Sequence, residues 1–270
     1  MKNDDLKEMT FIDHLEELRW HVIRSVIAIV VLAVVAFVEK RILFHEIILG
    51  PSRPDFWTYK MMCQLAQIVD QPFLCVEQLN FTIQSRNMTG QFTTHLSISI
   101  LAGFVIAFPY VFWELWRFIA PGLYHEERKI TRWAVLSVST LFLTGILFGY
   151  YIVAPLSINF LANYQIDESI INEFDLLSYI EVLTMMVLAC GLMFQLPMVV
   201  YALSKAGIVT PHLMRHFRRH AAVVILLIAA ILTPSPDVMS QLIVAIPIYL
   251  LYELSIFVSA YVERQKLRSN

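Results

Sequence analysis

The amino-acid sequence predicts an all-α integral membrane protein with six transmembrane helices. Three observations lead to this fold class. The 270 residues are 58% hydrophobic and 16% charged, against about 45–50% and about 25% in ordinary soluble domains. The hydrophobic residues fall in runs comparable to the roughly 20 residues that a helix needs to cross a bilayer. The basic residues gather on one side of those runs, and alternating patterns typical of membrane β-barrels are absent from the sequence.

Six apolar runs are the predicted spans. They are residues 22–38, 92–113, 133–155, 176–203, 221–232 and 239–262. The fifth run is short, at roughly 18 Å as a helix. The preceding residues 1–21 have apolar side chains near helical spacing, which predicts an amphipathic helix on the inner membrane surface. Six acidic residues in that segment are unlike the basic start of a secretory signal peptide, so the first run is expected to stay as an anchor.

Positively charged residues orient the predicted spans. Fifteen of the 20 Lys and Arg residues lie near the N-terminus, in the second and fourth loops, and in the C-terminal tail. The other five lie in the long first loop, residues 39–91, and the third and fifth loops contain none. This bias places both termini in the cytoplasm of a bacterial cell with a cytoplasmic (inner) membrane. Residues 39–91 are then a periplasmic segment, which we expect to fold as a cap.

The three cysteines fall in two environments. Cys63 and Cys75 lie in the first outer loop, where an oxidising compartment is compatible either with a disulfide between them or with two unpaired thiols. Cys190 falls inside the fourth span, where a small packing residue is expected.

Other classes of protein are disfavoured by composition. A net charge of −2 argues against nucleic-acid binding, and eight glycines scattered singly form no phosphate-binding loop. None of the histidines falls in the third to sixth spans, so an intramembrane Ser–His hydrolase lacks a base. The chain is therefore not predicted to be an enzyme, and no cofactor is expected.

A histidine series in the fourth loop raises the question of a metal site. His212, His216 and His220 are spaced by four, which would place them on one face of a helix. Three arginines crowd the same segment and repel a cation, so the sequence predicts a basic cytoplasmic loop and no metal.

Two polar residues lie inside the predicted spans. Placing such side chains in lipid costs free energy, so residues of this kind often have a function. Gln195 lies beside Pro197, which frees a backbone carbonyl, so a packing hydrogen bond is the alternative to a functional role. Glu253 lies in the sixth span and is either a paired structural carboxylate or a residue that lines a path. The second reading of Glu253 supports an alternative function, a small-solute or ion secondary transporter.

Four motifs occur in order along this six-span scaffold. They are His14–Arg19 (HLEELR), Phe118–Arg128 (FIAPGLYHEER), Phe194–Pro197 (FQLP), and Leu232–Asp237 (LTPSPD) with Ser240 and Gln241. Together they resemble the TatC family, the multispanning subunit of the twin-arginine protein translocase. The resemblance covers nearly the whole chain apart from the enlarged first outer loop.

This resemblance implies a receptor for folded proteins whose signal peptides contain two consecutive arginines. It also implies that transport of these proteins is driven by the proton-motive force. The partners it implies are single-span subunits of the TatA and TatB type, other TatC copies and the lipid bilayer. By motif position, Glu17 and Glu127 would bind the arginines, Phe118 would contact the apolar part of the peptide, and Arg19 would support the site.

The resemblance also implies a concave bundle with short fifth and sixth helices. Thr233 and Gln241 match positions that dock the single-span subunits. Gln195 matches a position that is often Glu, so hydrogen bonding replaces proton relay there. Four further positions are expected to be structural: Pro51, Pro121, Pro197 and Asp237.

Overall fold

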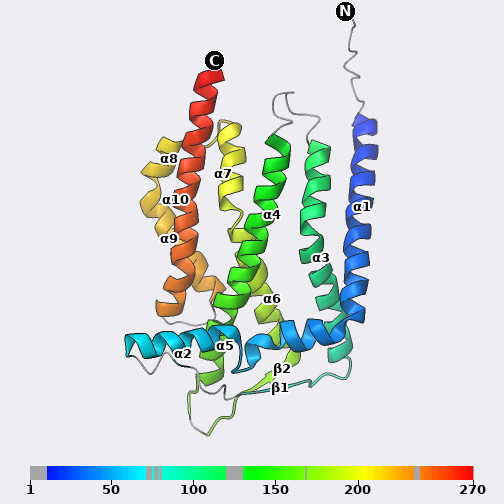
Figure 1. Ribbon diagram of the computed structural model, residues 1–270, viewed down its shortest axis with the longest axis vertical. Helices are drawn as coiled ribbons and strands as arrows, with labels where there is room; N and C mark the ends of the chain where they lie inside the picture. The colour runs from blue at the N-terminus through cyan, green and yellow to red at the C-terminus, as the bar shows by residue number, and fades with distance from the viewer. Residues whose placement is uncertain are drawn as a thin grey trace, which may run out of the picture. The chain divides into compact units, whose positions relative to one another are not determined.

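Helices make up most of the computed structural model of the protein (Figure 1). The structure describes residues 11–70, 75, 79, 81–119, 130–167, 169–233 and 238–269. The chain divides into two compact units. The first consists of Met1–Glu39 with Leu96–Ser139, and the second of Lys40–His95 with Thr140–Asn270.

The first unit is built on two long helices. Its elements are α1 (Phe11–Val38), most of α3 (Gly90–Ile119) and the first turns of α4 (Ile130–Phe148). α1 and α3 run antiparallel, because His21 contacts Glu114 near one end and Ala33 approaches Gly103 further along. A Cβ atom at Gly103 would lie 2.6 Å from the main-chain nitrogen of Ala33, so only glycine permits this close approach.

α1 joins two predicted segments in one helix. The surface helix expected within residues 1–21 and the span expected at residues 22–38 are continuous from Phe11 to Val38. No proline or glycine interrupts this stretch, so nothing in the backbone ends the helix where the sequence becomes apolar.

The second unit holds the remaining helices and a small sheet. Its helices are η1 (Arg41–Ile48), η2 (Gly50–Ser52), α2 (Trp57–Val69), the rest of α4, η6 (Gly149–Val153), α5 (Ala154–Asn163), α6 (Leu176–Met193), α7 (Leu196–Lys205), α8 (Pro211–His216), α9 (Arg218–Leu232) and α10 (Val238–Ser269). β1 (Thr82–Gln84) pairs in parallel with β2 (Glu173–Asp175), with Ile83 opposite Phe174.

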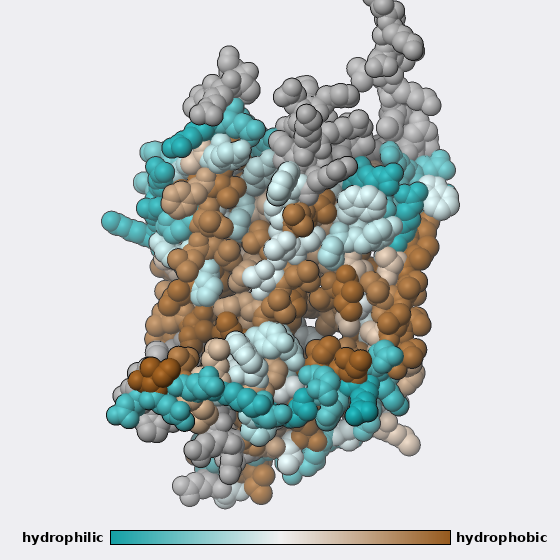
Figure 2. Space-filling model, viewed as in Figure 1, coloured by the Kyte–Doolittle hydropathy of each residue, from teal (hydrophilic) through white to brown (hydrophobic). Residues whose placement is uncertain are grey.

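The core of this unit lies where η6, α6, α9 and α10 meet. The buried residues there are Val153, Met186, Cys190, Ile225, Ala229, Leu232, Val244, Ala245 and Ile248. Outward-facing side chains are also largely apolar, and Figure 2 shows hydrophobic surface over the middle of α9 and α10 with hydrophilic surface toward α8. An apolar exterior of this kind is typical of a helix bundle that faces lipid.

Five helical segments are long and apolar enough to cross a membrane in the described part of the chain. They are Leu15–Val38, Gly90–Phe118, Trp133–Asn163, Leu176–Lys205 and Gln241–Lys266. These segments contain four of the six predicted spans and most of a fifth, residues 239–262. The other predicted span, residues 221–232, lies in α9, which has 15 residues and is about 22 Å long.

α10 differs from the short sixth helix that the family resemblance implies. It has 32 residues, because the polar tail that follows the apolar run continues the helix to Ser269. Pro247 lies inside α10 without ending it. The expectation of two short final helices is therefore wrong for α10.

Prolines divide the third and fourth spans. Before Pro155, which has no amide hydrogen, the helix widens into the π-helical turn η6. The carbonyl of Tyr151, four residues earlier, accepts a hydrogen bond from the hydroxyl of Thr58. Pro197 likewise lies in the first turn of α7, which follows a break at Phe194 and Gln195. The single predicted span is therefore divided into α6 and α7.

The predicted first outer loop, residues 39–91, is folded and contains η1, η2, α2 and β1. We call these residues the outer segment, after their predicted position. Its polar contacts run to the spans: the Tyr59 hydroxyl lies 2.9 Å from the Pro51 carbonyl and 3.0 Å from that of Pro155. Burial raises the pKa of Tyr59, which keeps its hydroxyl a hydrogen-bond donor. Cys63 and Cys75 are joined by a disulfide.

A glycine that allows two helices of the second unit to touch gives a stability prediction. A Cβ at Gly145 would lie 2.6 Å from the Cys190 carbonyl oxygen and 2.8 Å from the Cα of Gly191. Gly145→Val should therefore lower the free energy of unfolding by about 1–3 kcal/mol, the usual cost of overpacking. Thermal unfolding in detergent measures the change. The matched control is Thr144→Val on the exposed neighbouring position, and an equal loss in both variants would contradict the packing argument.

Candidate functional site

A carboxylate is buried between α1 and α3 in the first unit. Glu114 on α3 is 1% exposed. Its Oε2 lies 2.5 Å from Nδ1 of His21 and 3.8 Å from a guanidinium nitrogen of Arg24, both on α1. Its Oε1 accepts a 3.0 Å hydrogen bond from the Tyr110 hydroxyl. A buried carboxylate needs such partners, because its transfer from water without them is costly.

Helical periodicity explains why these four side chains meet. His21 and Arg24 are three residues apart on α1, and Tyr110 and Glu114 are four apart on α3, so each pair shares one helix face. We call these four residues the Glu114 cluster. The Arg24 guanidinium and the donors His21 and Tyr110 together offset the cost of burying this carboxylate.

Two predicted peptide-binding residues lie beside the Glu114 cluster. Glu17 is half-buried and lies one turn before His21 on the same face of α1. Phe118 lies one turn after Glu114 on α3, and its ring centroid is 6.1 Å from that of His21. Because α1 and α3 are antiparallel, Glu17 and Phe118 lie at the same end of the helix pair.

Arg19 lies on a different face of α1. A guanidinium nitrogen is 3.9 Å from a carboxylate oxygen of Glu16, and the guanidinium carbon is 5.6 Å from the centroid of the Trp20 ring. Both Arg19 and Glu16 are well exposed, so this ion pair contributes little to stability. Three other predicted site residues, Pro121, Glu127 and Asp237, lie outside the described residues.

Glu253 is held by a salt bridge in the second unit. Its Oε2 accepts a 2.7 Å hydrogen bond from Arg218 at the start of α9, and its Oε1 accepts a 3.2 Å bond from the Tyr249 hydroxyl. The side chain is thus a structural link between α9 and α10. This geometry favours the paired-carboxylate reading over the transporter hypothesis, which assigns Glu253 to a path.

The predicted docking residues form hydrogen bonds within the chain. The Thr233 hydroxyl donates to the Ala229 carbonyl at 2.9 Å, and the Gln241 amide donates to the Leu226 carbonyl at 2.9 Å. Thr233 is buried. These bonds fix the end of α9 and its attachment to α10, so both residues shape this corner of the unit.

The predicted structural prolines and Gln195 mark breaks in the helices. Pro51 is buried in η2, and its carbonyl accepts from Tyr59. Pro197 lies in the first turn of α7, directly after Gln195 and Leu196. The Gln195 main-chain carbonyl accepts from the amides of both Met198 and Val199 at 3.0 Å. Gln195 therefore sits at the turn that links α6 to α7.

The histidine series does not lie on one helix. α8 ends at His216 and α9 begins at Arg218, with Phe217 between them. His212 and His216 share α8, whereas His220 belongs to α9, so the expectation of one shared face is wrong. In the chain as the structure describes it, no group of three His, Cys, Asp or Glu side chains is placed to hold a metal ion.

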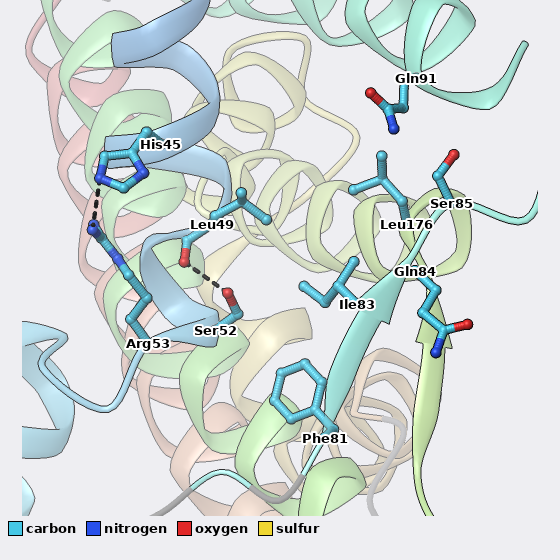
Figure 3. A pocket seen from close by; sticks show the side chains of 10 residues that line it. All are labelled: His45, Leu49, Ser52, Arg53, Phe81, Ile83, Gln84, Ser85, Gln91 and Leu176. Carbon is cyan, nitrogen blue, oxygen red and sulfur yellow. Dashed lines mark hydrogen bonds between the residues drawn. The ribbon is translucent and has the colours of Figure 1, made fainter.

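A pocket of about 430 Å³ opens in the outer segment of the second unit (Figure 3). Its lining comes from η1, η2, the β1 segment and the starts of α3 and α6. Those residues are His45, Leu49, Ser52, Arg53, Phe81, Ile83, Gln84, Ser85, Gln91 and Leu176. In Figure 3, Arg53 and His45 are joined by a 3.3 Å hydrogen bond and Ser52 donates to the Leu49 carbonyl at 2.8 Å. Arg53 also faces Glu46 at 3.5 Å, so its charge is already compensated.

Sequence reasoning missed the Glu114 cluster. The predicted second span, residues 92–113, ends one residue before Glu114. His21 and Glu114 are 93 residues apart, and no local pattern pairs them. A usable signal was present nonetheless: Tyr110 and Glu114 stand four residues apart on one helix face, and His21 and Arg24 stand at the inner start of another span.

Comparison with known proteins connects this arrangement to one family. Residues 13–247 match the family model described as Sec-independent protein translocase protein (TatC). The TatC protein of Blattabacterium sp. subsp. Periplaneta americana is 36% identical over 268 residues, covering 98% of this chain and 100% of that protein. The TatC protein of Aquifex aeolicus is 32% identical, covering 96% and 98% respectively.

Solved structures give the same result. A crystal structure of the twin-arginine translocase receptor TatC has 30% sequence identity and a TM-score of 0.63, covering 93% of this chain and 99% of that chain. A second crystal structure of the same receptor, in DDM, has 33% identity and a TM-score of 0.66, covering 91% and 99%.

The long apolar helices define a multi-pass helical membrane protein. The chain belongs to the TatC family of Sec-independent protein translocase proteins. It is a component of a protein translocase and not an enzyme.

The buried pair predicts a large stability effect. His21→Leu keeps most of the side-chain volume but removes the closest partner of Glu114. We expect a loss of about 3 kcal/mol in the free energy of unfolding, because a buried carboxylate loses its closest hydrogen-bond donor. Chemical or thermal unfolding in detergent measures it. Arg19→Gln, which breaks only the exposed pair with Glu16, should change stability by less than about 1 kcal/mol. A loss of that small size in His21→Leu would rule out a stabilising role for the Glu114 pair.

Proposed function

We propose that this protein is the receptor subunit of a twin-arginine translocase in a bacterial cytoplasmic membrane. It binds the signal peptides of folded proteins through two consecutive arginines. The observation that carries the proposal is the position of Glu17 and Phe118 at one end of the α1–α3 pair, beside the Glu114 cluster. Family membership supports it, since two matching crystal structures are of a twin-arginine translocase receptor.

Charge pairing supports Glu17 as an arginine contact. Both carboxylate oxygens of Glu114 already have partners in His21, Arg24 and Tyr110, so we do not assign this side chain to the peptide arginines. Glu17 lies on the same helix face but nearer the end, where an incoming guanidinium reaches it. Arginine pairs best with a carboxylate through two parallel hydrogen bonds, so two arginines need two carboxylates. Glu127 supplies the second in this proposal.

Phe118 has the role of an apolar contact in the proposed site. It ends the described face of α3 and leads into residues 120–129, the segment that contains Glu127. Its ring lies next to His21, which holds it beside the acidic side chains. Arg19, on another face of α1, supports the site through surface charge instead of contacting the peptide arginines.

Assembly with single-span partners is the second part of the proposal. Thr233 and Gln241 hold the corner between α9 and α10, and α9 exposes Val223, Leu227 and Ile231 beside it. TatA- and TatB-type helices dock there, and further TatC copies join the complex. In this topology α9 is the short fifth of six spans, both termini are cytoplasmic, and the proton-motive force drives transport.

Neighbouring glutamates of α1 provide a matched test of the peptide site. Glu17→Gln should weaken the binding of a twin-arginine signal peptide about tenfold or more, which corresponds to about 1.4 kcal/mol. Glu16→Gln removes the same charge from an exposed position paired with Arg19 and should leave the affinity unchanged. Fluorescence anisotropy of a labelled peptide with the purified protein measures both. Equal affinities in the two variants would remove Glu17 from the site.

Export in living cells tests the whole function. In cells that lack their own receptor, this chain should restore export of a folded reporter with a twin-arginine signal peptide. Glu127→Lys should abolish export and crosslinking to that peptide while the protein stays in the membrane, because a cation replaces one of the two carboxylates. A reporter whose two arginines are changed to lysine is the control. Unchanged crosslinking in Glu127→Lys would refute the assigned site.

A further inference from the structure

Helix α2 of the outer segment exposes a stripe of large apolar side chains. Trp57, Met61, Leu65 and Ile68 are 54%, 41%, 49% and 79% exposed. Their spacing of four, four and three residues puts them along one side of the helix. We call these four residues the α2 stripe. Four large apolar residues aligned on one helix are more than the scattered exposure that is normal on a water-facing surface.

The stripe is one of three distinct sides of α2. A second side packs on the protein, where Tyr59 and Ala66 are 1% and 4% exposed. The third side is polar and exposed, with Lys60 and Gln67. A helix that met only protein and water would need two sides. The apolar third side indicates contact with a third medium.

Chain length places α2 at the level where a bilayer ends. The Thr58 hydroxyl binds the Tyr151 carbonyl, and the Tyr59 hydroxyl binds that of Pro155. Both carbonyls belong to the candidate span Trp133–Asn163. Counted from Trp133, Tyr151 and Pro155 lie about 27 and 33 Å along a helix. This matches the thickness of the hydrocarbon core, about 30 Å.

Aromatic residues and charge fit the same level. The Trp57 ring is 5.8 Å from Tyr151, and Phe56 is 5.5 Å from Tyr150, so four aromatic rings gather where α2 meets the span. Aromatic side chains of this kind concentrate at membrane–water interfaces. Lys60 is the only charged residue between Trp57 and Val69, so α2 carries no carboxylate that anionic lipid headgroups would repel.

The direction of α2 also suits an interfacial helix. Figure 1 shows α2 lying across the direction of α9 and α10, as a helix in the plane of a membrane surface would. Figure 2 shows hydrophilic surface along the side of α2 that faces the viewer and hydrophobic surface above it. Cys63 lies on the polar side of the helix, so its disulfide to Cys75 is attached away from the stripe.

We propose that α2 is a membrane anchor, with the α2 stripe inserted among the lipids of the outer leaflet and the Lys60 side in water. The helix thereby fixes the height of the outer segment on the bilayer. The occupant of the stripe is lipid, because the stripe begins at the aromatic cluster where α2 meets the span, at the level where the hydrocarbon core ends.

Spin labels on α2 test this in the full chain reconstituted in lipid nanodiscs. Cys190→Ala removes the free thiol while the disulfide keeps Cys63 and Cys75 unreactive, so a single new cysteine carries the nitroxide. Leu65→Cys and Ile68→Cys report on the stripe, and the matched controls Lys60→Cys and Gln67→Cys report on the polar side. At stripe positions, collisions with oxygen, which concentrates in lipid, should exceed those with a water-soluble nickel chelate severalfold. The polar positions should show the reverse.

Two outcomes overturn the proposal. Stripe labels as accessible to the nickel chelate as the Gln67 label would mean that the stripe faces water. Stripe labels shielded from both reagents would mean that protein, such as a second copy of this chain, covers it. If the labelled variants fail to fold, a photoreactive lipid in the same nanodiscs is used on the unmodified chain. Crosslinks within Trp57–Val69 are then expected, and their absence refutes the anchor.

Discussion

Satisfying the main-chain carbonyls at the outer ends of the spans is the constraint on which the second unit depends. In an apolar medium each carbonyl needs a donor from the protein, since water is absent. Pro51 and Pro155 offer no amide hydrogen to the turns before them. Hydroxyl groups take over: Thr58 donates to the Tyr151 carbonyl, and Tyr150 donates to that of Ile47 at 2.7 Å. Each bond joins the outer segment to a span, so the prolines that break the helices also create the attachment points of the cap.

In the first unit the polar group that must be satisfied is a buried side chain, the carboxylate of Glu114. Its partners are side chains of α1 and α3: His21, Arg24 and Tyr110. Because both carboxylate oxygens of Glu114 have partners within the cluster, this side chain joins the ends of α1 and α3. In the function proposed above, peptide binding is therefore left to other carboxylates, Glu17 and Glu127.

Sequence patterns predicted the spans well and their details poorly. Hydropathy located the five long helical segments, because an apolar run of about 20 residues is typical of a transmembrane helix. Hydropathy placed the end of the second span too early, at residue 113. α3 continues through Glu114 to Ile119, and the partner that permits burial of Glu114, His21, is 93 residues away in the chain. The break at Phe217 and the three-residue strands carry no periodicity of their own. For the candidate site, Glu17 and Phe118 came from motif resemblance, whereas their shared end of the helix pair required the antiparallel packing of α1 and α3.

The parallel pairing of β1 with β2 has a consequence for biogenesis. Thr82 pairs with Glu173, which the ribosome adds 91 residues later. At a synthesis rate of about 5–20 residues per second, β1 waits several seconds for its partner. During that time the second and third spans must be inserted, because both lie between the two strands in the chain. Closure of the outer segment is therefore a late event that reports the correct insertion of the spans before it.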